Sequence, residues 1–370
     1  MIYLDNAATT LVKPYAVGAA AIRAMKNAAS VGRGAHRPAV LASELVYEAR
    51  EQASALFDAG GAERVVFTSN ATHALNIAIA SFDLRGRRVV TSGWEHNSVM
   101  RPLAASGAVT EAAFGALFDR ETNLRAFDRA LTRDTALAVV CHVSNVFGFI
   151  LPIEEIAEIC RARGIPLVVD ASQSAGVCPL SLRRLGAAFI AMPGHKSLYG
   201  PQGTGILLCG ENAPVRPLLR GGTGSISRSL DMPEFLPDAL EAGTHNVSGI
   251  AGLCEGIRFV AARGTDSILA HERALARRAA ELLERTGRAR CYTARDSAAQ
   301  SGVLSFTVNG TDCHTAAERL AERGIAVRAG LHCAPLAHTS AGSDGTVRAS
   351  FSVFNTPSDA EALADAVSRI

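Results

Sequence analysis

The sequence of 370 residues contains no apolar run of about 18 residues or more, which argues against a membrane-spanning helix. Its first residues, MIYLDNAATTLVKP, lack the basic stretch and apolar core of a secretory signal peptide. We therefore expect a cytoplasmic protein. Charged residues make up only 19% and the net charge is +2, without a long run of like charges. Neither nucleic acid nor a membrane surface is expected as a partner.

Paired cysteines are also missing. None of the eight cysteines forms a CxxC motif, and their spacing fits neither a zinc site nor a secreted disulfide scaffold, so we expect no metal site. Seven of the eight are expected to be small buried hydrophobic residues. These are Cys141, Cys160, Cys178, Cys209, Cys254, Cys291 and Cys313.

Cys333 differs from the other cysteines because of the segment around it, RAGLHCAPLAH. Gly330 permits a tight turn and Pro335 is expected to end regular structure, so the thiol is predicted to lie on a loop. Arg328 and His332 bring cationic groups near this thiol, and such neighbours increase the thiolate fraction. Cys333 is therefore a candidate nucleophile. The alternative is a buried structural cysteine.

Short apolar segments alternate with helical patterns through the first two thirds of the chain. The length favours two domains, and 48% hydrophobic residues are enough for a sizeable core. Continuously apolar strands separated by helices predict a mostly parallel α/β sheet covered on both faces. The predicted strands are 63–69, 87–93, 135–145, 165–174, 187–196 and 204–210, and the predicted helices are 37–57 and 70–82.

The pattern changes near residue 243. Helices are predicted at 248–264, 267–287, 312–324 and 358–370, and strands at 302–308 and 346–352. This order is typical of a smaller α+β domain. We predict a large domain of residues 14–246 and a small domain of residues 1–13 and 247–370, which carries the Cys333 loop.

Polar residues follow the predicted strands where each strand ends. Ligands of parallel sheets bind beyond the carboxyl ends of the strands, so these residues form a candidate site. Asn70-Ala71-Thr72 begins a helix, where free N–H groups bind phosphate; alternatively, Asn70 is an ordinary N-cap. The other residues are Glu95, His96, Asn97, Asn145, Asp170, Gln173, His195 and Lys196.

This combination meets the requirements of pyridoxal 5'-phosphate. Lys196 can bond covalently to the cofactor, and Asp170 can hold the pyridine nitrogen protonated, which makes the ring an electron sink. The His96 imidazole can lie flat on the ring, and the segment at Thr72 can bind the phosphate. We expect a lowered pKa for Lys196, because burial and the positive pyridine both disfavour its charge.

Eight segments form ordered motifs: YLDNAATT, SNATHALN, EHNSV, HVSNVFG, VVDASQSAG, GHKSLYGPQGTG, EAGTHN and RAGLHCAP. Together they span nearly the whole chain and resemble the class V aminotransferases, specifically the cysteine desulfurases. The resemblance implies the fold-type I architecture of pyridoxal phosphate enzymes. That architecture has a seven-stranded, mostly parallel sheet with helices on both faces and a smaller α+β domain. The resemblance also implies a homodimer.

The resemblance assigns a role to each candidate residue. Lys196 corresponds to the cofactor lysine, Asp170 to the partner of the pyridine nitrogen, Gln173 to the partner of the ring hydroxyl and His96 to the stacking ring. The implied phosphate contacts are Ala71, Thr72, His195 and the partner subunit's Thr244. The implied substrate contacts are Asn145, Arg348, Arg328 and Ala7.

Arg348 suits a substrate carboxylate because its planar fork can pair with both oxygens. Without the resemblance, Arg348 would be interpreted as an edge-strand arginine that faces water.

Two positions depart from the resemblance. Pro193 precedes Gly-His-Lys where many relatives have a serine or threonine that contacts phosphate. Phosphate binding is therefore expected to depend more on Thr72, His195 and Thr244. His245 and Asn246 replace a common Pro-Asn pair, and we infer no consequence from this second departure.

The resemblance implies conversion of L-cysteine to L-alanine. Lys196 moves a proton, Cys333 attacks the substrate sulfur, and the persulfide on Cys333 passes to a sulfur acceptor. Only 14 residues separate Cys333 from Arg348, as in the group-II, SufS-like desulfurases. An acceptor protein is therefore expected to approach the site. The implied process is sulfur mobilisation, including iron–sulfur cluster assembly, but the acceptor itself is not identified.

Other interpretations stay open. A selenocysteine lyase, or a class V aminotransferase, epimerase or lyase, would use the same lysine, and L-selenocysteine shares size and charge with L-cysteine. A scaffold protein without catalysis is a further alternative, although it would need none of Lys196, Asp170, His96 and Arg348. Bound cofactor would colour the protein and so distinguish an enzyme from a scaffold.

Overall fold

The computed structural model describes residues 1–32 and 34–370. The helices are α1 Tyr15–Asn27, α2 Arg37–Leu56, α3 Ala71–Ala80, α4 Asn97–Ala105, α5 Arg120–Ala130, α6 Ile153–Ala162, α7 Leu182–Leu185, α8 Val247–Arg263, α9 Thr265–Arg285, α10 Cys313–Glu322, α11 Pro335–Ala341 and α12 Pro357–Ser368. Among the helices of these two ranges, none combines the length and apolarity needed to cross a membrane.

Most strands belong to one of two sheets. The strands are β1 Ile2–Tyr3, β2 Val65–Thr68, β3 Arg88–Ser92, β4 Val109–Ala113, β5 Thr135–Cys141, β6 Leu167–Asp170, β7 Phe189–Pro193, β8 Gly205–Cys209, β9 Ala289–Tyr292, β10 Val303–Val308, β11 Ile325–Ala326, β12 Arg328–Gly330 and β13 Thr346–Ser350.

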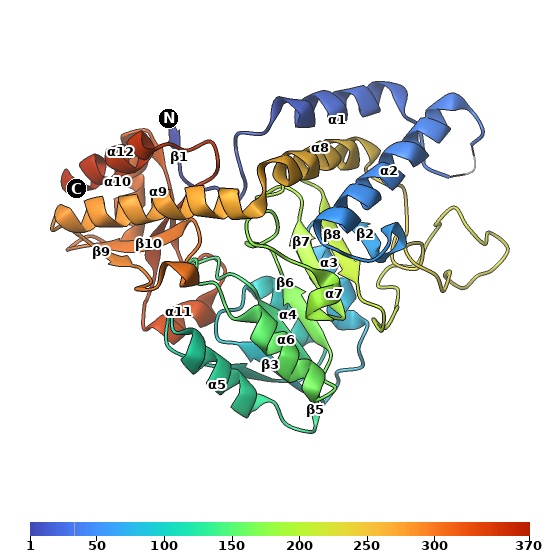
Figure 1. Cartoon of the computed structure of the whole chain (residues 1–370), viewed down its shortest axis with the longest axis horizontal. Helices are drawn as coiled ribbons and strands as arrows, with labels where there is room; N and C mark the ends of the chain where they lie inside the picture. The colour runs from blue at the N-terminus through green and yellow to red at the C-terminus, as the bar shows by residue number, and fades with distance from the viewer. Residues whose placement is uncertain (33) are drawn as a thin grey trace.

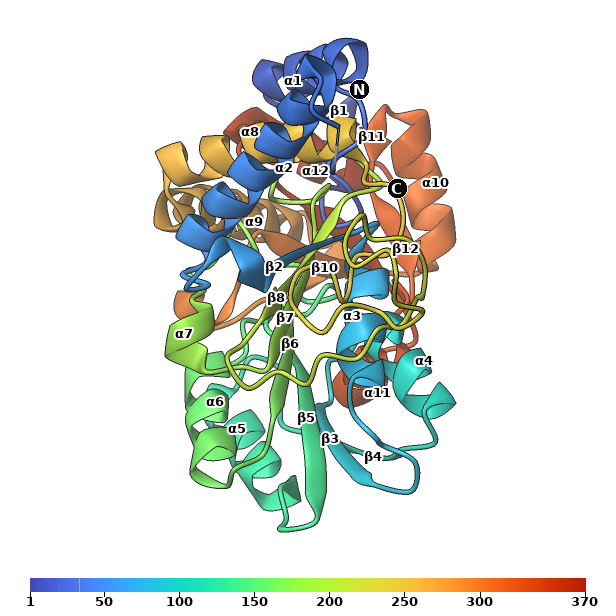
Figure 2. The same cartoon turned by 90° about the vertical axis from the view of Figure 1, so that its right-hand side faces the viewer.

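The large sheet has seven strands in the order β2-β8-β7-β6-β5-β3-β4. All neighbours pair in parallel except β8, which is antiparallel to both β2 and β7. Figure 2 shows α5, α6 and α7 on one side of this sheet and α3 and α4 on the other. The predicted seven-stranded, mostly parallel sheet is therefore confirmed, and the carboxyl ends of β3, β5, β6 and β7 meet at one edge.

Helices on both faces explain why the strands are continuously apolar. Successive strand residues point to opposite faces, so both faces of each strand must be apolar. On β6, Val168 packs into the core under α3 and α4, and Val169 packs into the core of the opposite face. Both valines are fully buried, and each contributes about 2 kcal/mol of hydrophobic free energy.

The small sheet has four antiparallel strands in the order β12-β13-β10-β9. Its core takes side chains from α9, α10 and α12, such as Leu275, Leu320 and Leu363. β1 pairs in parallel with β11, and Figure 1 shows the N-terminus beside α12. The first residues therefore pack with the last third of the chain.

Helix α8 lies between the two parts. It packs on α1 and α2, and its side chains Leu253 and Ile257 join the core of the large sheet. From Leu275 onward, the buried side chains of α9 belong to the core of the small sheet. Packing alone would divide the chain along α9, so the boundary at residue 247 stays a prediction.

Every strand and helix expected from the sequence patterns is present to within a few residues at each end. The patterns did not predict the short strands β1, β11 and β12 or the helices α1, α4, α5, α6, α7 and α11. They also missed β4 and β9, whose sequences VTEAA and ARCY lack an apolar run. Both are edge strands, which need fewer apolar residues than central strands. The predicted burial of cysteines is confirmed at five positions and wrong for Cys291 and Cys313, which are partly exposed.

Candidate active site

A cavity of about 130 Å³ opens at the carboxyl ends of the parallel strands. Its walls come from the segments that follow β2, β3, β5, β6 and β7, which is where a parallel sheet binds ligands. The predicted residues that line it are Ala71, Thr72, His96, Asn145, Asp170, Gln173, His195 and Lys196. The cavity also contacts Asn70, Trp94, Ser98, Cys141, Val143, Ser172 and Pro193.

Lys196 stands in the tight turn between β7 and β8. Its carbonyl accepts a hydrogen bond from the N–H of Tyr199 at 2.9 Å, which closes the turn. A Cβ at Gly194 would lie 2.2 Å from Oγ1 of Thr204, so only glycine fits there. Burial lowers the pKa of Lys196 to about 8, although the Asp170 carboxylate acts in the opposite direction. The expected direction is confirmed, and it increases the fraction of neutral amine.

Asp170 and Gln173 hold the wall behind the cavity. Asp170 ends β6, is buried, and accepts a hydrogen bond at Oδ1 from the N–H of Ser172 at 2.9 Å. Gln173 donates from Nε2 to the carbonyl of Ala7 at 2.9 Å. The carboxylate is thus fixed at the cavity, and the same wall is tied to the N-terminal segment.

The imidazole of His96 caps α4 beside the cavity. Its Nδ1 accepts a hydrogen bond from the N–H of Ser98 at 3.0 Å. Burial lowers the pKa of His96, against the influence of Asp170, so the ring is neutral near pH 7. A neutral, fixed imidazole can stack on a flat heteroaromatic ring.

Ser98 was not singled out from the sequence. Its Oγ lies 2.9 Å from Nδ1 of His96 and 2.9 Å from Oγ1 of Thr72, so it joins the two sides of the cavity. The signal that could have found it is its place two residues after His96, in the first turn of α4.

The N-terminus of α3 borders the cavity. Oδ1 of Asn70 accepts the N–H of His73 at 2.8 Å, which confirms the N-cap interpretation. Ala71 and Thr72 occupy the first helical positions, where N–H groups have no partner within the helix. Such an end binds an anion, so the N-cap and phosphate-binding interpretations of this segment are compatible.

These residues fit pyridoxal phosphate. The cavity offers an amine with a lowered pKa, a buried carboxylate, a neutral imidazole and a helix N-terminus. Burial also lowers the pKa of His195 to about 4, and its Nδ1 lies 3.0 Å from Oγ1 of Thr9. Pro193 contributes no hydroxyl to the wall, whereas the paired hydroxyls of Thr72 and Ser98 do.

Cys333 lies in a turn that is fixed against the large domain. Its carbonyl accepts the N–H of Asn97 at 2.8 Å, directly after His96. Nδ2 of Asn145 donates to the carbonyl of His332 at 2.8 Å. His332 and Cys333 have φ values of +51° and +58°, a region that costs a non-glycine residue about 1 kcal/mol. Among the described residues, Cys333 is the one exposed cysteine.

Two expectations about this loop are wrong. His332 is buried, and burial with nearby Arg348 lowers its pKa to about 2, so His332 is neutral and supplies no positive charge to the thiol. Pro335 does not end regular structure but begins α11, because a helix tolerates proline in its first turn. Ser340 of α11 donates to the carbonyl of Gly93 at 2.6 Å and holds the helix on the large domain.

Arg348 lies in the middle of the small sheet, with a side chain that is 2% exposed. The interpretation as a strand arginine facing water is therefore wrong. Nη1 donates to the carbonyl of Asn145 at 2.9 Å, and Nη2 to Oδ1 of Asp5 at 2.8 Å. Arg328 stands directly opposite on β12 and is exposed. Asn145 thus connects the cavity to the arginine and to the Cys333 turn.

The structure does not bring Thr244 to the cavity of its own chain. Thr244 is exposed and lines a separate cavity of about 220 Å³, together with residues such as His73 and His245. Nε2 of His245 lies 2.6 Å from Oε2 of Glu241, and this carboxylate also pairs with Arg50. The EAGTHN segment is therefore held at Glu241 and His245, while Thr244 between them is exposed.

Comparisons with known proteins agree with this geometry. The sequence pattern of the Aminotransferase class-V family matches residues 2–363. A probable cysteine desulfurase of Pyrococcus abyssi is 33% identical over 373 residues, which cover 98% of this chain and 92% of the relative. The apo structure of a cysteine desulfurase from Thermococcus onnurineus NA1 has a TM-score of 0.91 at 32% identity, covering 100% and 94% of the two chains.

The cysteine desulfurase CsdA from Escherichia coli has a TM-score of 0.88 at 30% identity, covering 99% of this chain and 94% of that one. These similarities extend over both sheets and over the turn that carries Cys333. The family implies pyridoxal phosphate, which the lysine, carboxylate and helix terminus of the cavity fit. From its first strand to its last helix, this chain belongs to the aminotransferase class-V family.

Proposed function

We propose that the protein is a pyridoxal phosphate-dependent cysteine desulfurase that converts L-cysteine to L-alanine. One observation carries the proposal beyond the family: Cys333 is an exposed cysteine whose backbone carbonyl is held by the N–H of Asn97, the residue that follows His96 at the cavity. An aminotransferase needs no thiol at this place. The relative from Pyrococcus abyssi, named as a probable cysteine desulfurase, and the cysteine desulfurase from Thermococcus onnurineus NA1 support the same conclusion.

The cavity residues supply binding and proton transfer. When bound, the cofactor supplies an electron sink for bonds at the substrate α-carbon. Lys196 would hold the cofactor and, with a pKa lowered to about 8, can take up and release a proton near pH 7 to 8. Asp170 would hold the ring nitrogen protonated, Gln173 would contact the ring hydroxyl, and Ala71, Thr72 and His195 would hold the phosphate.

Arg348 and Asn145 bind the carboxylate of the amino acid, with Arg328 and Ala7 beside them. The sulfur step then takes place at Cys333. Its thiolate sulfur forms a bond to the substrate sulfur, and the carbon–sulfur bond of the substrate breaks. The electron pair of that bond stays with carbon, which takes up a proton and becomes the methyl group of alanine. Cys333 keeps the outer sulfur as a persulfide.

The proposal includes two partners. A second copy of the chain would bring the partner subunit's Thr244 to the phosphate, since Thr244 lies outside the cavity of its own chain. A sulfur acceptor would approach Cys333, because the turn is fixed by Asn97 and Asn145 and is too short to reach outward. The acceptor decides which process uses the sulfur, iron–sulfur cluster assembly among them.

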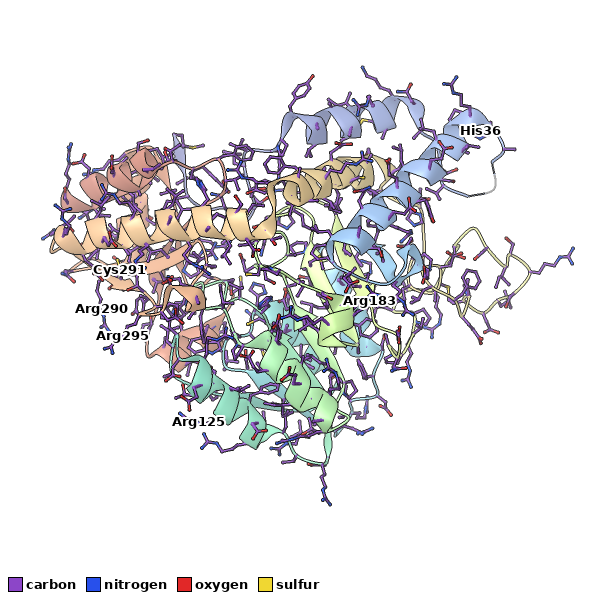
Figure 3. The ribbon with its side chains drawn as sticks, viewed as in Figure 1. His36, Arg125, Arg183, Arg290, Cys291 and Arg295 are labelled. Atoms are coloured by element: carbon purple, nitrogen blue, oxygen red, sulfur yellow. The ribbon has the colours of Figure 1, made fainter. Side chains whose placement is uncertain are left out.

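Alanine and sulfide release from L-cysteine tests this function, in the presence of a thiol reductant. We expect Cys333→Ala to keep the visible colour of the wild-type protein and to lose turnover by about 10²-fold or more. Cys291→Ala is the matched control: Cys291 lies on β9, labelled in Figure 3, and is partly exposed. Equal turnover by Cys333→Ala and wild type would show that Cys333 is not the nucleophile.

A further inference from the structure

Arg348 is a buried cation in an unusual position. Its strand β13 pairs with β12 on one side, where Arg328 stands directly opposite. Residues directly opposite in antiparallel strands share a face of the sheet, and like charges at such positions repel each other. The side chain of Arg348 is also 2% exposed, so water does not compensate its charge.

Asp5 compensates this charge. Its Oδ1 accepts a hydrogen bond from Nη2 of Arg348 at 2.8 Å, and the Asp5 side chain is 21% exposed. The second contact of the guanidinium is the carbonyl of Asn145, at 2.9 Å from Nη1. Asp5 is thus the one carboxylate that forms an ion pair with Arg348 within residues 1–32 and 34–370.

Three donors of Arg348 remain after these two contacts. A guanidinium carries five N–H groups in one plane, and Asp5 and Asn145 each take one. Nε is buried and finds no acceptor in the part of the chain that the structure describes. Leaving a buried donor without an acceptor costs free energy, so this edge of the guanidinium is suited to a ligand with planar acceptor oxygens. A carboxylate has this geometry.

The position of Asp5 is fixed by the strand that carries Arg348. Asp5 forms a bridge with Ser350, whose N–H donates to the carbonyl of Leu4 at 2.7 Å. Oγ of Ser350 accepts the N–H of Ala7 at 2.8 Å, and the carbonyl of Ala7 accepts from Gln173 at the cavity. The N-terminal segment therefore connects the cavity wall to the arginine, with Asp5 between them.

We infer that Asp5 is a positioning residue, which holds Arg348 so that two of its remaining donors can pair with the α-carboxylate of an amino acid substrate. The inference rests on the proposed function for the identity of that amino acid and for the role of Arg348 in binding its carboxylate. Asp5 touches neither substrate nor cofactor; it acts by fixing the plane of the guanidinium and by cancelling part of its charge. Without Asp5, the guanidinium would turn toward other acceptors, and the carboxylate would lose its preformed fork.

Two ligands that differ only by the carboxylate test this role. L-alanine carries the carboxylate, and ethylamine is the same molecule without it. Each is titrated into the coloured holoenzyme, and binding is followed by the change in visible absorbance. We expect Asp5→Ala to weaken L-alanine binding about ten-fold or more, and to change ethylamine binding less than about two-fold. Asp5→Asn, which keeps the shape and one acceptor oxygen, should fall between Asp5→Ala and wild type.

Rescue and a matched control complete the experiment. Added formate can occupy the space left in Asp5→Ala and should restore part of the L-alanine affinity, with no such gain in wild type. Asp83→Asn removes an exposed carboxylate from the same protein and should bind both ligands as wild type does. Should Asp5→Ala bind L-alanine as wild type does, or lose both ligands equally, Asp5 has a structural role only.

This outcome is separate from the proposed function. Binding of L-alanine and ethylamine does not require sulfur transfer, so the titration is decisive even if the protein releases no alanine from L-cysteine. Conversely, if Asp5→Ala still binds L-alanine in preference to ethylamine as wild type does, the test of Cys333 by alanine and sulfide release is not affected. If Asp5→Ala does not fold, Asp5→Asn is titrated with the same two ligands. Weaker binding of L-alanine with unchanged binding of ethylamine would support the positioning role, and unchanged binding of both would overturn it.

Discussion

The two sides of the site are built in different ways. The cavity side consists of residues that directly follow strands of one sheet. Some of them are held by near neighbours, as Ser172 holds Asp170, and Gln173 and His195 also contact the N-terminal segment. The opposite side, with Cys333 and Arg348, is held by groups more than 200 residues away in sequence. Asn97 fixes the cysteine turn, and Asp5 and Asn145 fix the arginine.

Because of this difference, substitutions on the two sides should cause two different defects. Changes on the cavity side should alter cofactor binding and therefore colour. Changes on the opposite side should alter binding of the amino acid or transfer of sulfur and leave the colour as it is. Three substitutions, taken from the largest expected effect to the smallest, test this separation.

Lys196→Ala is expected to have the largest effect, because it removes both the covalent attachment and the amine that moves a proton. Turnover of L-cysteine should fall about 10³-fold or more, and the wild-type visible absorbance should disappear. A visible spectrum and an alanine assay measure both. Lys26→Ala, on the exposed end of α1, is the control. If Lys196→Ala keeps wild-type colour and turnover, Lys196 neither binds the cofactor nor transfers the proton.

Arg348→Lys should have a smaller effect of a different kind. Lysine keeps the positive charge beside Asp5 but cannot pair with both oxygens of a carboxylate. We expect KM for L-cysteine to rise about ten-fold, with the visible spectrum of the unliganded protein unchanged. Arg369→Lys, an exposed arginine in the last residues, serves as control. A spectrum altered as strongly as that of Lys196→Ala would mean that the two sides are not separable.

Glu95→Gln tests the support behind the cavity side and concerns stability alone. Glu95 is fully buried, and Oε1 accepts hydrogen bonds from Oγ of Ser92 at 2.5 Å and from the N–H of Cys141 at 2.9 Å. Burial raises the pKa of Glu95 to about 8, and the Ser92 hydrogen bond opposes this rise. The folded protein therefore holds a proton that the unfolded chain loses above about pH 4.5.

Stability should consequently decrease as pH rises from about 4.5 to 8, and the loss is absent in Glu95→Gln. Between pH 5.5 and 7.5, the free energy of unfolding of wild type should fall by about 2 kcal/mol relative to the variant. Urea unfolding of both cofactor-free proteins at the two pH values measures this difference. A constant difference between the two proteins would show that Glu95 is ionised in the folded state.

The fold and the cavity could be predicted from the sequence because both follow from local patterns. Apolar runs of strand length mark the central strands, and the polar residue after each run necessarily lies at the sheet edge. Asp170 and Lys196 were found in this way. Edge strands such as β9 were missed, because exposure on one side removes the apolar run on which the prediction depends.

The support of the site was harder to predict. Ser98 and Asp5 both stand in motifs that were noticed, but nothing near them in sequence indicates that Ser98 contacts Thr72 or that Asp5 contacts Arg348. Ser98 meets Thr72 only because α3 and α4 lie side by side. Asp5 meets Arg348 across 343 positions of sequence. The charge of His332 was predicted wrongly for the same reason, since its burial is a property of the folded chain.

The sequence by itself determined the parallel sheet, the residues at its carboxyl edge and the loop position of Cys333. Periodicity, strand-end polarity and turn residues act over a few positions, so they can be recognised without the fold. Only the tertiary structure decided that Arg348 is buried and paired with Asp5, that His332 is neutral and that Thr244 faces outward. Burial, charge compensation and pKa depend on which distant segments exclude water, and that is settled only when the two sheets pack together.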